Sequence, residues 1–282
     1  MDDTPLTLRE VLDVLARLYP PETAQSWDRV GLVTGDPAQP VRRIHLAVDP
    51  TLAVVEEARA LGADLLLTHH PLLLRGVHSV ATTTGKGATV TGLVVGDIAL
   101  YVAHTNADVA DEGVCEALAE ASGLGHTDPL AWSEGQAMGR VGDLPEPVSL
   151  RRFVEDLAVH LPATAVGVRV SGPPDAPVRR VAVLGGAGDD LFDAVRAAGA
   201  DVYVTADLRH HPALEAREES RGGPPYLVDA GHWASEQVWL GRADRALRAA
   251  LGEDATRVET HISTVRTDPW TFVVGADAGG TP

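Results

Sequence analysis

The chain carries the stretch Asp64-Leu65-Leu66-Leu67-Thr68-His69-His70-Pro71. Its apolar run, which lies between Gly62 and a proline, predicts a short buried strand. The strand ends in two adjacent histidines, whose side chains would point to opposite sides, so that each could hold a different metal ion. Histidine is also common in loops, so the pair could equally be an ordinary polar strand end. The stretch alone therefore leaves both interpretations open.

The segments around this strand predict a parallel sheet with helical crossovers. Residues 43–48 have the pattern of a strand and residues 51–61 that of a helix, after which the chain enters the strand at 64–68. A strand, a helix and a strand joined by short loops form a βαβ unit, in which the two strands are parallel. A helix at 88–96 and a strand at 98–103 continue this alternation. The first part of the chain is therefore expected to be an α/β lobe.

The second half of the chain repeats the first at one constant offset. Val41-Arg42-Arg43-Ile44 matches Val178-Arg179-Arg180-Val181, and Gly62-Ala63-Asp64 matches Gly199-Ala200-Asp201, each 137 residues later. Solenoid repeats are much shorter than this spacing, so the repeat indicates two related lobes. The fold class that we expect is α/β, with two pseudo-symmetric α/β lobes and the metal site in the cleft between them.

The repeat also suggests domain boundaries. We expect the first lobe to cover residues 1–126 and the second to cover 127–275. Residues 260–275 are a candidate segment for packing back on the first lobe, and 276–282 are expected to be a disordered tail.

Each half places a histidine just after a strand and a carboxylate four residues later. His104 and Asp108 follow the strand at 98–103, and His232 and Glu236 follow a strand at 226–229. Residues four apart at the start of a helix share a face and can meet the same ion. A single helix is expected to run on from the first pair to about Ser122. Functional groups gather at the carboxyl ends of strands in open α/β sheets, which is where all of these residues fall.

The residue types favour a reactive metal site. Histidine and carboxylate ligands without thiolate suit Zn, Mn, Fe or Co, whereas structural zinc sites usually use cysteine. Three or four histidines and two carboxylates are enough for two divalent ions per chain. Such ions acidify water and polarise phosphoryl or carbonyl oxygens, which is the chemistry of a two-metal hydrolase.

Composition limits the other functions that the chain could have. The net charge of −17 argues against broad binding to nucleic acid or to anionic membranes. The one cysteine, Cys115, suits the reducing cytosol and falls in a helical pattern, where a buried thiol is expected. The chain shows neither a signal-peptide pattern nor a long apolar run, so we expect a cytoplasmic protein that does not enter the membrane.

Several motifs together resemble the Nif-three-like proteins, which are often described as GTP cyclohydrolase type-2 homologues. The motifs that carry the resemblance are Trp27-Asp28-Arg29-Val30-Gly31-Leu32, Leu67-Thr68-His69-His70-Pro71, His104-Thr105-Asn106-x-Asp108, Gly199-Ala200-Asp201 to Thr205-x-Asp207 with His211, Gly231-His232-x-x-x-Glu236 and Thr267-Asp268-Pro269. The resemblance spans nearly the whole chain. It implies a dinuclear metal centre in a toroidal homohexamer, a trimer of dimers. The metal ligands that it implies are His69, His70, Asp108, His232 and Glu236, with His104 close by.

Two classes of function remain open at this point. The first is a two-metal hydrolase acting on a nucleotide or another phosphorylated small molecule, in which Glu236 or His104 moves protons. The second is a non-catalytic metal-binding regulatory or interaction protein that presents the surface of a ring. The carboxylate-rich ligand set favours the first.

Other features of the sequence give weaker signals. The second lobe has Ala206-Asp207 where the first has its histidine pair, so Asp207 is at best a residue that supports a ligand. His211, near a helix start, is a candidate for the rim of a pocket or for substrate contact. The glycine-rich stretch at 184–188 could bind phosphate but is more typical of a tight turn after a strand. The remaining histidines are interpreted as surface or satisfied core groups, and Trp132, Trp233, Trp239 and Trp270 as packing or interface residues.

Overall fold

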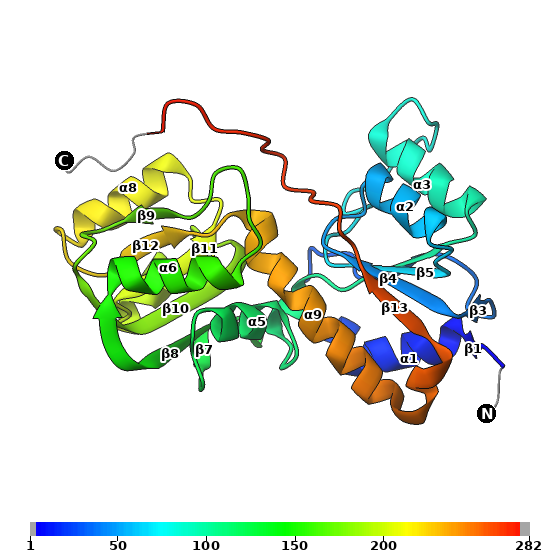
Figure 1. The fold of residues 1–282 in the computed structure, drawn as a ribbon, viewed down its shortest axis with the longest axis horizontal. Coiled ribbons are helices and arrows are strands. Elements are labelled where there is room, and N and C mark those ends of the chain that lie inside the picture. Colours follow the sequence, from blue (N-terminus) through cyan, green and yellow to red (C-terminus); the bar gives the residue numbers. More distant parts are fainter. Residues whose placement is uncertain (1–3, 277–282) are drawn as a thin grey trace. The chain divides into compact units, whose positions relative to one another are not determined.

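The computed structural model describes residues 4–276 and has a mixed α/β fold (Figure 1). All but the first residue of the predicted disordered tail, 276–282, lies outside the described residues. The chain divides into two compact units. The first consists of Met1–Ala117, Trp132–Met138 and Trp239–Thr267, and the second of Leu118–Ala131, Gly139–Val238 and Asp268–Pro282.

A five-stranded sheet forms the centre of the first unit. Its strands stand in the order β13-β4-β5-β6-β2. The four strands from β13 to β6 are parallel, and β2 is antiparallel to β6. The strands are β2 (Gly31–Thr34), β4 (Arg43–Ala47), β5 (Leu65–Thr68), β6 (Ala99–Val102) and β13 (Glu259–Ile262), and a separate antiparallel pair is formed by β1 (Leu6–Thr7) and β3 (Pro40–Val41). The predicted parallel sheet is therefore confirmed, with an antiparallel strand added at one edge.

Helices cover both faces of this sheet, as Figure 1 shows. Leu66 of β5 and Leu100 of β6 pack in a buried cluster with apolar residues of α2 and α3. Leu65 and Leu67 are also buried but alternate with Leu66, so they face the side of α1. The helices are α1 (Leu8–Leu18), η1 (Pro21–Thr23), α2 (Leu52–Ala60), α3 (Gly85–Val95), α4 (Thr105–Val109), α5 (Val114–Ala121), α9 (His232–Leu251) and η2 (Gly252–Arg257), of which α5 and α9 belong to both units.

The prediction of a single helix running to Ser122 is wrong, because the chain leaves the helical conformation at Ala110. Ala110 has an extended backbone with ψ 154°. Gly113 then turns so tightly that a Cβ atom on it would lie 2.0 Å from the carbonyl oxygen of Ala107. Only glycine allows such a close approach of two backbone segments. The result is two short helices, α4 and α5, in place of one long helix.

The second unit is built on a six-stranded sheet. Its strand order is β7-β8-β10-β11-β12-β9. Strands β10, β11 and β12 are parallel, while β8 and β9 are antiparallel to their neighbours. The strands are β7 (Asp128–Ser133), β8 (Gln136–Ser149), β9 (Arg169–Ser171), β10 (Pro177–Ala187), β11 (Val202–Ala206) and β12 (Tyr226–Asp229), and the helices are α6 (Leu150–His160), α7 (Phe192–Ala197) and α8 (His210–Glu219). One face is covered by Leu118 of α5 and by Phe153 and Leu157 of α6, all in one buried cluster with the strands.

The internal repeat is visible in the strand register of the two units. Ile44 pairs with Leu65 in the first sheet, and Val181 pairs with Val202 in the second. These four positions are related by the offset seen in the sequence. The order β4-β5-β6 likewise corresponds to β10-β11-β12. Each unit therefore contains the same three-stranded parallel core.

The repeated aspartates fix the start of this core in each unit. One oxygen of Asp64 accepts hydrogen bonds from the backbone N–H groups of Arg42 and Arg43, at 2.7 and 2.9 Å. Asp201 accepts the equivalent bonds from Arg179 and Arg180, both at 2.8 Å. Backbone donors to a carboxylate satisfy groups that a strand end would otherwise leave open. The sequence repeat therefore preserves a structural anchor.

A buried histidine–glutamate pair ties the last strand of the first unit to its interior. The His45 side chain is fully buried, and its Nε2 lies 2.9 Å from a Glu57 carboxylate oxygen. Glu57 also accepts hydrogen bonds from the hydroxyl groups of Ser263 and Thr264, just beyond β13. The ring of His261 stacks on that of His45 with centroids 5.1 Å apart. His45 is therefore a core residue, as expected, but only its Nε2 is paired. In the described residues its buried Nδ1 has no hydrogen-bond partner.

Changing Glu57 to glutamine should weaken the fold in a pH-dependent way. Burial acts to raise the pKa of Glu57, but hydrogen bonds from Ser263 and Thr264 outweigh it and hold the pKa at about 2. Because this value lies below the unfolded-state value of 4.5, the stabilisation is complete above about pH 4.5 and is lost as the pH falls toward 2. The free energy of unfolding of Glu57→Gln at pH 7 should be lower by about 1–2 kcal/mol.

Urea unfolding between pH 2 and pH 7 measures this effect. The variant should show a flatter loss of stability on the acid side than the wild type. Glu56→Gln, on the exposed side of the same helix, is the matched control and should behave like the wild type. An equal acid-side slope in Glu57→Gln and in the wild type would contradict the assignment.

Candidate metal centre

Three histidines gather at the carboxyl ends of β5 and β6 in the first unit. His69 and His70 directly follow β5, and His104 follows β6. Each offers one ring nitrogen such that the three atoms lie within 4.8 Å of one another. The rings of His69 and His70 are 5.0 Å apart, and those of His69 and His104 are 5.1 Å apart. The parallel strands thus bring together residues that are 34 positions apart in the sequence.

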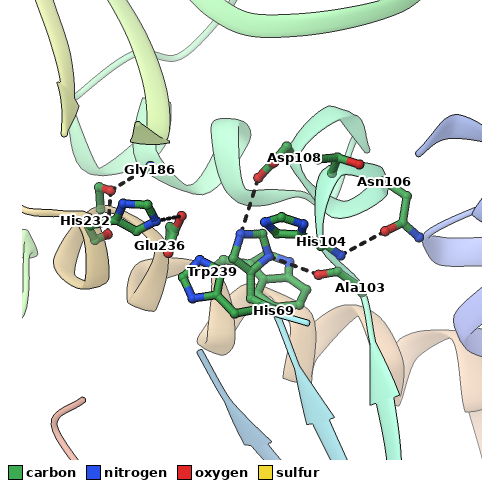
Figure 2. Close-up of polar contacts among 12 residues, drawn as sticks. His69, Ala103, His104, Asn106, Asp108, Gly186, His232, Glu236 and Trp239 are labelled. Atoms are coloured by element: carbon green, nitrogen blue, oxygen red, sulfur yellow. Dashed lines mark hydrogen bonds and ion pairs between the residues drawn. The ribbon is translucent and has the colours of Figure 1, made fainter. Parts of the chain in front are cut away.

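His69 is buried and oriented from two sides. Its Nδ1 lies 3.0 Å from the backbone carbonyl oxygen of Ala103, as Figure 2 shows. A carbonyl oxygen only accepts, so Nδ1 carries the proton and Nε2 presents its lone pair. Nε2 lies 3.6 Å from a carboxylate oxygen of Asp108. The ring also packs against Trp239, whose side chain is fully buried, with centroids 5.5 Å apart.

His70 is held by a carboxylate that the C-terminal segment also contacts. Its Nδ1 lies 2.7 Å from Asp49 Oδ1, in the loop that follows β4. The hydroxyl group of Thr267 donates to the other oxygen of Asp49. A carboxylate that accepts from Nδ1 of a ligating histidine fixes the ring and raises the basicity of Nε2. Residues 49 and 267 therefore set the direction in which His70 points.

His104 is oriented in the same way by Asp28. Its Nδ1 lies 2.9 Å from Asp28 Oδ1, and Oδ2 accepts from both the backbone N–H and the hydroxyl group of Thr105. Burial acts to raise the pKa of Asp28, but these hydrogen bonds, led by the one from His104, hold it well below its usual range. Asp28 is therefore a carboxylate that accepts the Nδ1 proton. Asn106 fixes the turn by accepting from the backbone N–H of His104 at 2.9 Å and donating to the Tyr19 carbonyl at 2.8 Å.

A second group of ligand types lies at the start of α9 in the second unit. His232 Nδ1 is 2.8 Å from Asp207, and His232 Nε2 is 3.0 Å from Glu236 Oε1. Asp207 has a left-handed backbone with φ 52°, a strained conformation that aspartate tolerates better than most residues. The Glu236 side chain is only 4% exposed. With Nδ1 protonated toward Asp207, two acceptors face each other at 3.0 Å, and a shared cation or proton satisfies both.

The absence of a side chain at Gly186 leaves room for the side chains of Glu236 and His232. It lies near the end of β10 with φ +69°, and its N–H donates to the hydroxyl group of Ser235 at 3.0 Å. A Cβ atom at this position would lie 2.5 Å from Glu236 Oε1 and 3.3 Å from His232 Nε2. Figure 2 shows these three residues together. The glycine therefore keeps the two side chains beside each other.

The histidine cluster of the first unit fits a divalent metal ion, and the second unit adds a histidine–carboxylate pair of the same donor types. All four imidazoles have Nδ1 held by an oxygen acceptor, and a carboxylate oxygen lies next to Nε2 of His69 and of His232. Neutral histidines with a fixed Nδ1 proton and nearby carboxylates are the ligands that Zn, Mn, Fe and Co accept. The pattern is also typical of the groups that support metal ligands in known sites.

The structure brings several of the predicted site residues together within each unit. His69, His70, His104 and Asp108 are neighbours in the first, and His232 and Glu236 are neighbours in the second, with Asp207 supporting His232. His210 and His211 open α8, and their rings contact each other. The glycine-rich stretch is not a turn after a strand, because residues 184–187 are the last residues of β10 itself.

Sequence reasoning missed two residues of the site and the role of a third. Asp49 was assigned no role from the sequence, although a carboxylate directly after a predicted strand is the signal that could have found it. Asp28 was part of a recognised motif without an assigned role. Gly186 gave no signal of its own, because close approach to a side chain from α9 depends on the tertiary fold.

The fold and the site together define an α/β protein with a candidate histidine–carboxylate metal centre at strand ends. The chain belongs to the Duf34/NIF3 (NGG1p interacting factor 3) family, whose profile matches residues 6–269. The resemblance seen in the sequence is therefore confirmed. In the described residues, we find no helix that is both long and apolar enough to cross a membrane.

Relatives and solved structures agree with this assignment. The chain is 50% identical over 274 residues to a Streptomyces coelicolor protein named GTP cyclohydrolase 1 type 2 homolog, covering 95% of each chain. A Bacillus cereus protein related to NIF3 has a structure with a TM-score of 0.85 at 27% identity, covering 95% of this chain and 99% of that one. A Staphylococcus aureus protein has a TM-score of 0.86 at 28% identity, covering 95% and 100%.

Proposed function

We propose that this chain binds two divalent metal ions and hydrolyses a nucleotide or another phosphorylated small molecule. The ligands proposed are His69, His70, Asp108, His232 and Glu236, which together form one dinuclear centre. The observation that carries the proposal is the common orientation of the imidazoles, each with Nδ1 bound to an oxygen acceptor.

Helix α9 carries two of the proposed ligands. It carries His232 and Glu236 in its first turns and, three residues after the glutamate, Trp239, which packs on the ring of His69. The names of several relatives, GTP cyclohydrolase 1 type 2 homolog, point to a hydrolytic reaction on a nucleotide for those proteins. For this chain we propose hydrolysis of a nucleotide or another phosphorylated small molecule at phosphorus, in a homo-oligomer that we propose to be a hexamer.

Bound divalent ions would lower the pKa of water and polarise a phosphoryl oxygen. Hydrolysis then forms one P–O bond to water and breaks the bond to the leaving oxygen, which takes up a proton. His104 Nε2 is placed to accept the proton of the attacking water, since its Nδ1–H is held by Asp28. The Asp28 carboxylate stabilises the imidazolium that results, as in other carboxylate–histidine pairs. Glu236 is the other proposed proton carrier.

Metal analysis combined with an activity screen tests the proposal. Purified protein grown with supplied metal should contain close to two divalent ions per chain. Loaded in turn with Mn, Zn, Fe and Co, it should hydrolyse at least one member of a broad panel of phosphoesters and nucleotides. His104→Gln should keep its metal and lose on the order of 100-fold or more in kcat.

Three outcomes would count against the proposal in different ways. A metal content near zero would remove the site itself. Full metal content without turnover of any compound would instead favour the regulatory or interaction protein, in which the ions serve stability or sensing. Hydrolysis that persists in metal-free protein would show that the activity has another source.

A further inference from the structure

Trp27 lies on a loop that is fixed on both sides. The backbone N–H of Gln25 donates to the hydroxyl group of Thr105 at 2.9 Å. Ser26 donates through both its N–H and its hydroxyl group to the carboxylate of Glu134, each at 2.8 Å. On the other side, Asp28 is bound to His104 and Thr105, as described above. The loop therefore has little freedom to move Trp27.

Between these anchors, the Trp27 indole is exposed to solvent and lies beside His104. Trp27 is 53% exposed, whereas Gln25 and Asp28 on either side of it are buried at 8% and 6%. Its ring centroid is 5.9 Å from that of His104, at an interplanar angle of 81°. Because the indole and the imidazole meet edge-to-face, part of the indole surface stays available for contact with a second aromatic ring. Keeping that apolar area in water forgoes the favourable free energy of burying it.

We propose that Trp27 stacks on a planar heteroaromatic ring of the small molecule on which the histidine cluster acts. The inference rests on the proposed function and narrows its substrate class to phosphorylated compounds that carry such a ring. The π face of an indole binds any nucleobase-like ring, while the fixed loop sets where that ring lies relative to His104. Nucleoside 5′-phosphates have the required parts, a planar ring at one end and a phosphate at the other.

Equilibrium binding to metal-loaded, full-length protein tests this inference. The probes are the 5′-monophosphates of adenosine, guanosine, cytidine and uridine, with ribose 5-phosphate as the probe that keeps sugar and phosphate but lacks the ring. Calorimetry should show that at least one nucleotide binds roughly tenfold or more tightly than ribose 5-phosphate. Stacking should also quench tryptophan emission in the wild type and not in Trp27→Phe.

Substitutions at Trp27 separate ring stacking from other roles. Trp27→Ala should weaken nucleotide binding by roughly tenfold and leave ribose 5-phosphate unchanged, while Trp27→Phe should lose only about two- to threefold. The matched control is Trp270→Ala, since Trp270 is exposed to a similar degree, 62%. That variant should bind like the wild type. Metal content should be the same in all of these proteins.

Several results would overturn the inference. Equal affinity for nucleotides and ribose 5-phosphate, or no binding of any probe, would show that no ring is recognised. A change in oligomeric state in Trp27→Ala, measured by light scattering, would show that the indole is an interface residue. Failure of the proposed function would give a different result. If nucleotides bind through their ring but are not hydrolysed, the proposed hydrolysis is wrong and Trp27 remains a binding residue. If compounds with and without a ring are hydrolysed equally well, only the proposed role of Trp27 is wrong.

Discussion

Replacing His70 with alanine is expected to lower metal affinity by at least about 100-fold and to abolish hydrolysis at the same time. Removing a group that merely supports a ligand typically costs 10- to 100-fold in metal affinity, so loss of a direct ligand should cost at least as much. His70 is better suited to this test than His69. The His69 side chain is buried at 1% and packs on Trp239, so truncating it would also leave a cavity.

Metal-dependent thermal stability gives a readout that is independent of activity. An ion that binds only the folded state at 100 times its Kd stabilises that state by about 2.7 kcal/mol. The wild type should therefore melt at a higher temperature in saturating metal than in chelator, and His70→Ala should show little difference between the two conditions. His78→Ala, at an exposed histidine, is the matched control. If His70→Ala kept the full metal-dependent shift, His70 could not be a ligand.

The change of Gly186 to alanine should disturb the second ligand pair without removing any ligand. The new Cβ would lie 2.5 Å from Glu236 Oε1, and the carboxylate can relieve this contact only by rotating away from His232. We expect metal affinity to fall by roughly tenfold or more, comparable to the loss of a supporting residue. The left-handed backbone, with φ +69°, should add about 1–2 kcal/mol of destabilisation.

Gly199 provides the control that separates the two effects. It has nearly the same backbone conformation, φ +65°, and a Cβ atom there would meet nothing within 4 Å. Gly199→Ala should therefore lose a similar amount of stability and keep its metal affinity. Calorimetric titration with Mn or Zn and urea unfolding measure the two quantities. Equal metal affinity in both variants would contradict the role assigned to Gly186.

The sequence allowed much of the fold to be predicted because local patterns and the repeat agreed with each other. The apolar run before His69 is long enough only for a strand, and its counterpart at Val202–Ala206 confirms the assignment. Asp64 and Asp201 recur because both anchor the same strand start. The proximity of His69 and His104 could be predicted because parallel strands end at one edge of a sheet.

The supporting residues could not be predicted because they depend on contacts between distant segments. Asp49 receives a hydrogen bond from Thr267, which is 218 residues away. The break between α4 and α5 depends on how closely Gly113 approaches the carbonyl oxygen of Ala107. Exposure of Trp27 likewise depends on anchors at Thr105 and Glu134. None of these contacts produces a periodic pattern of residue types from which it could be predicted.

The position of β13 has a consequence for how the protein is made. This strand, Glu259–Ile262, lies beside β4, so the N-terminal sheet is completed by residues that are synthesised long after β4; Glu259 follows its partner Arg43 by 216 positions. Pairing between segments so distant in sequence is entropically costly and slow to form. Thr267, which steadies Asp49 and through it His70, emerges later still. A nascent chain therefore exposes one edge of its first sheet until β13 has been synthesised, and His70 reaches its final geometry only after Thr267 has emerged.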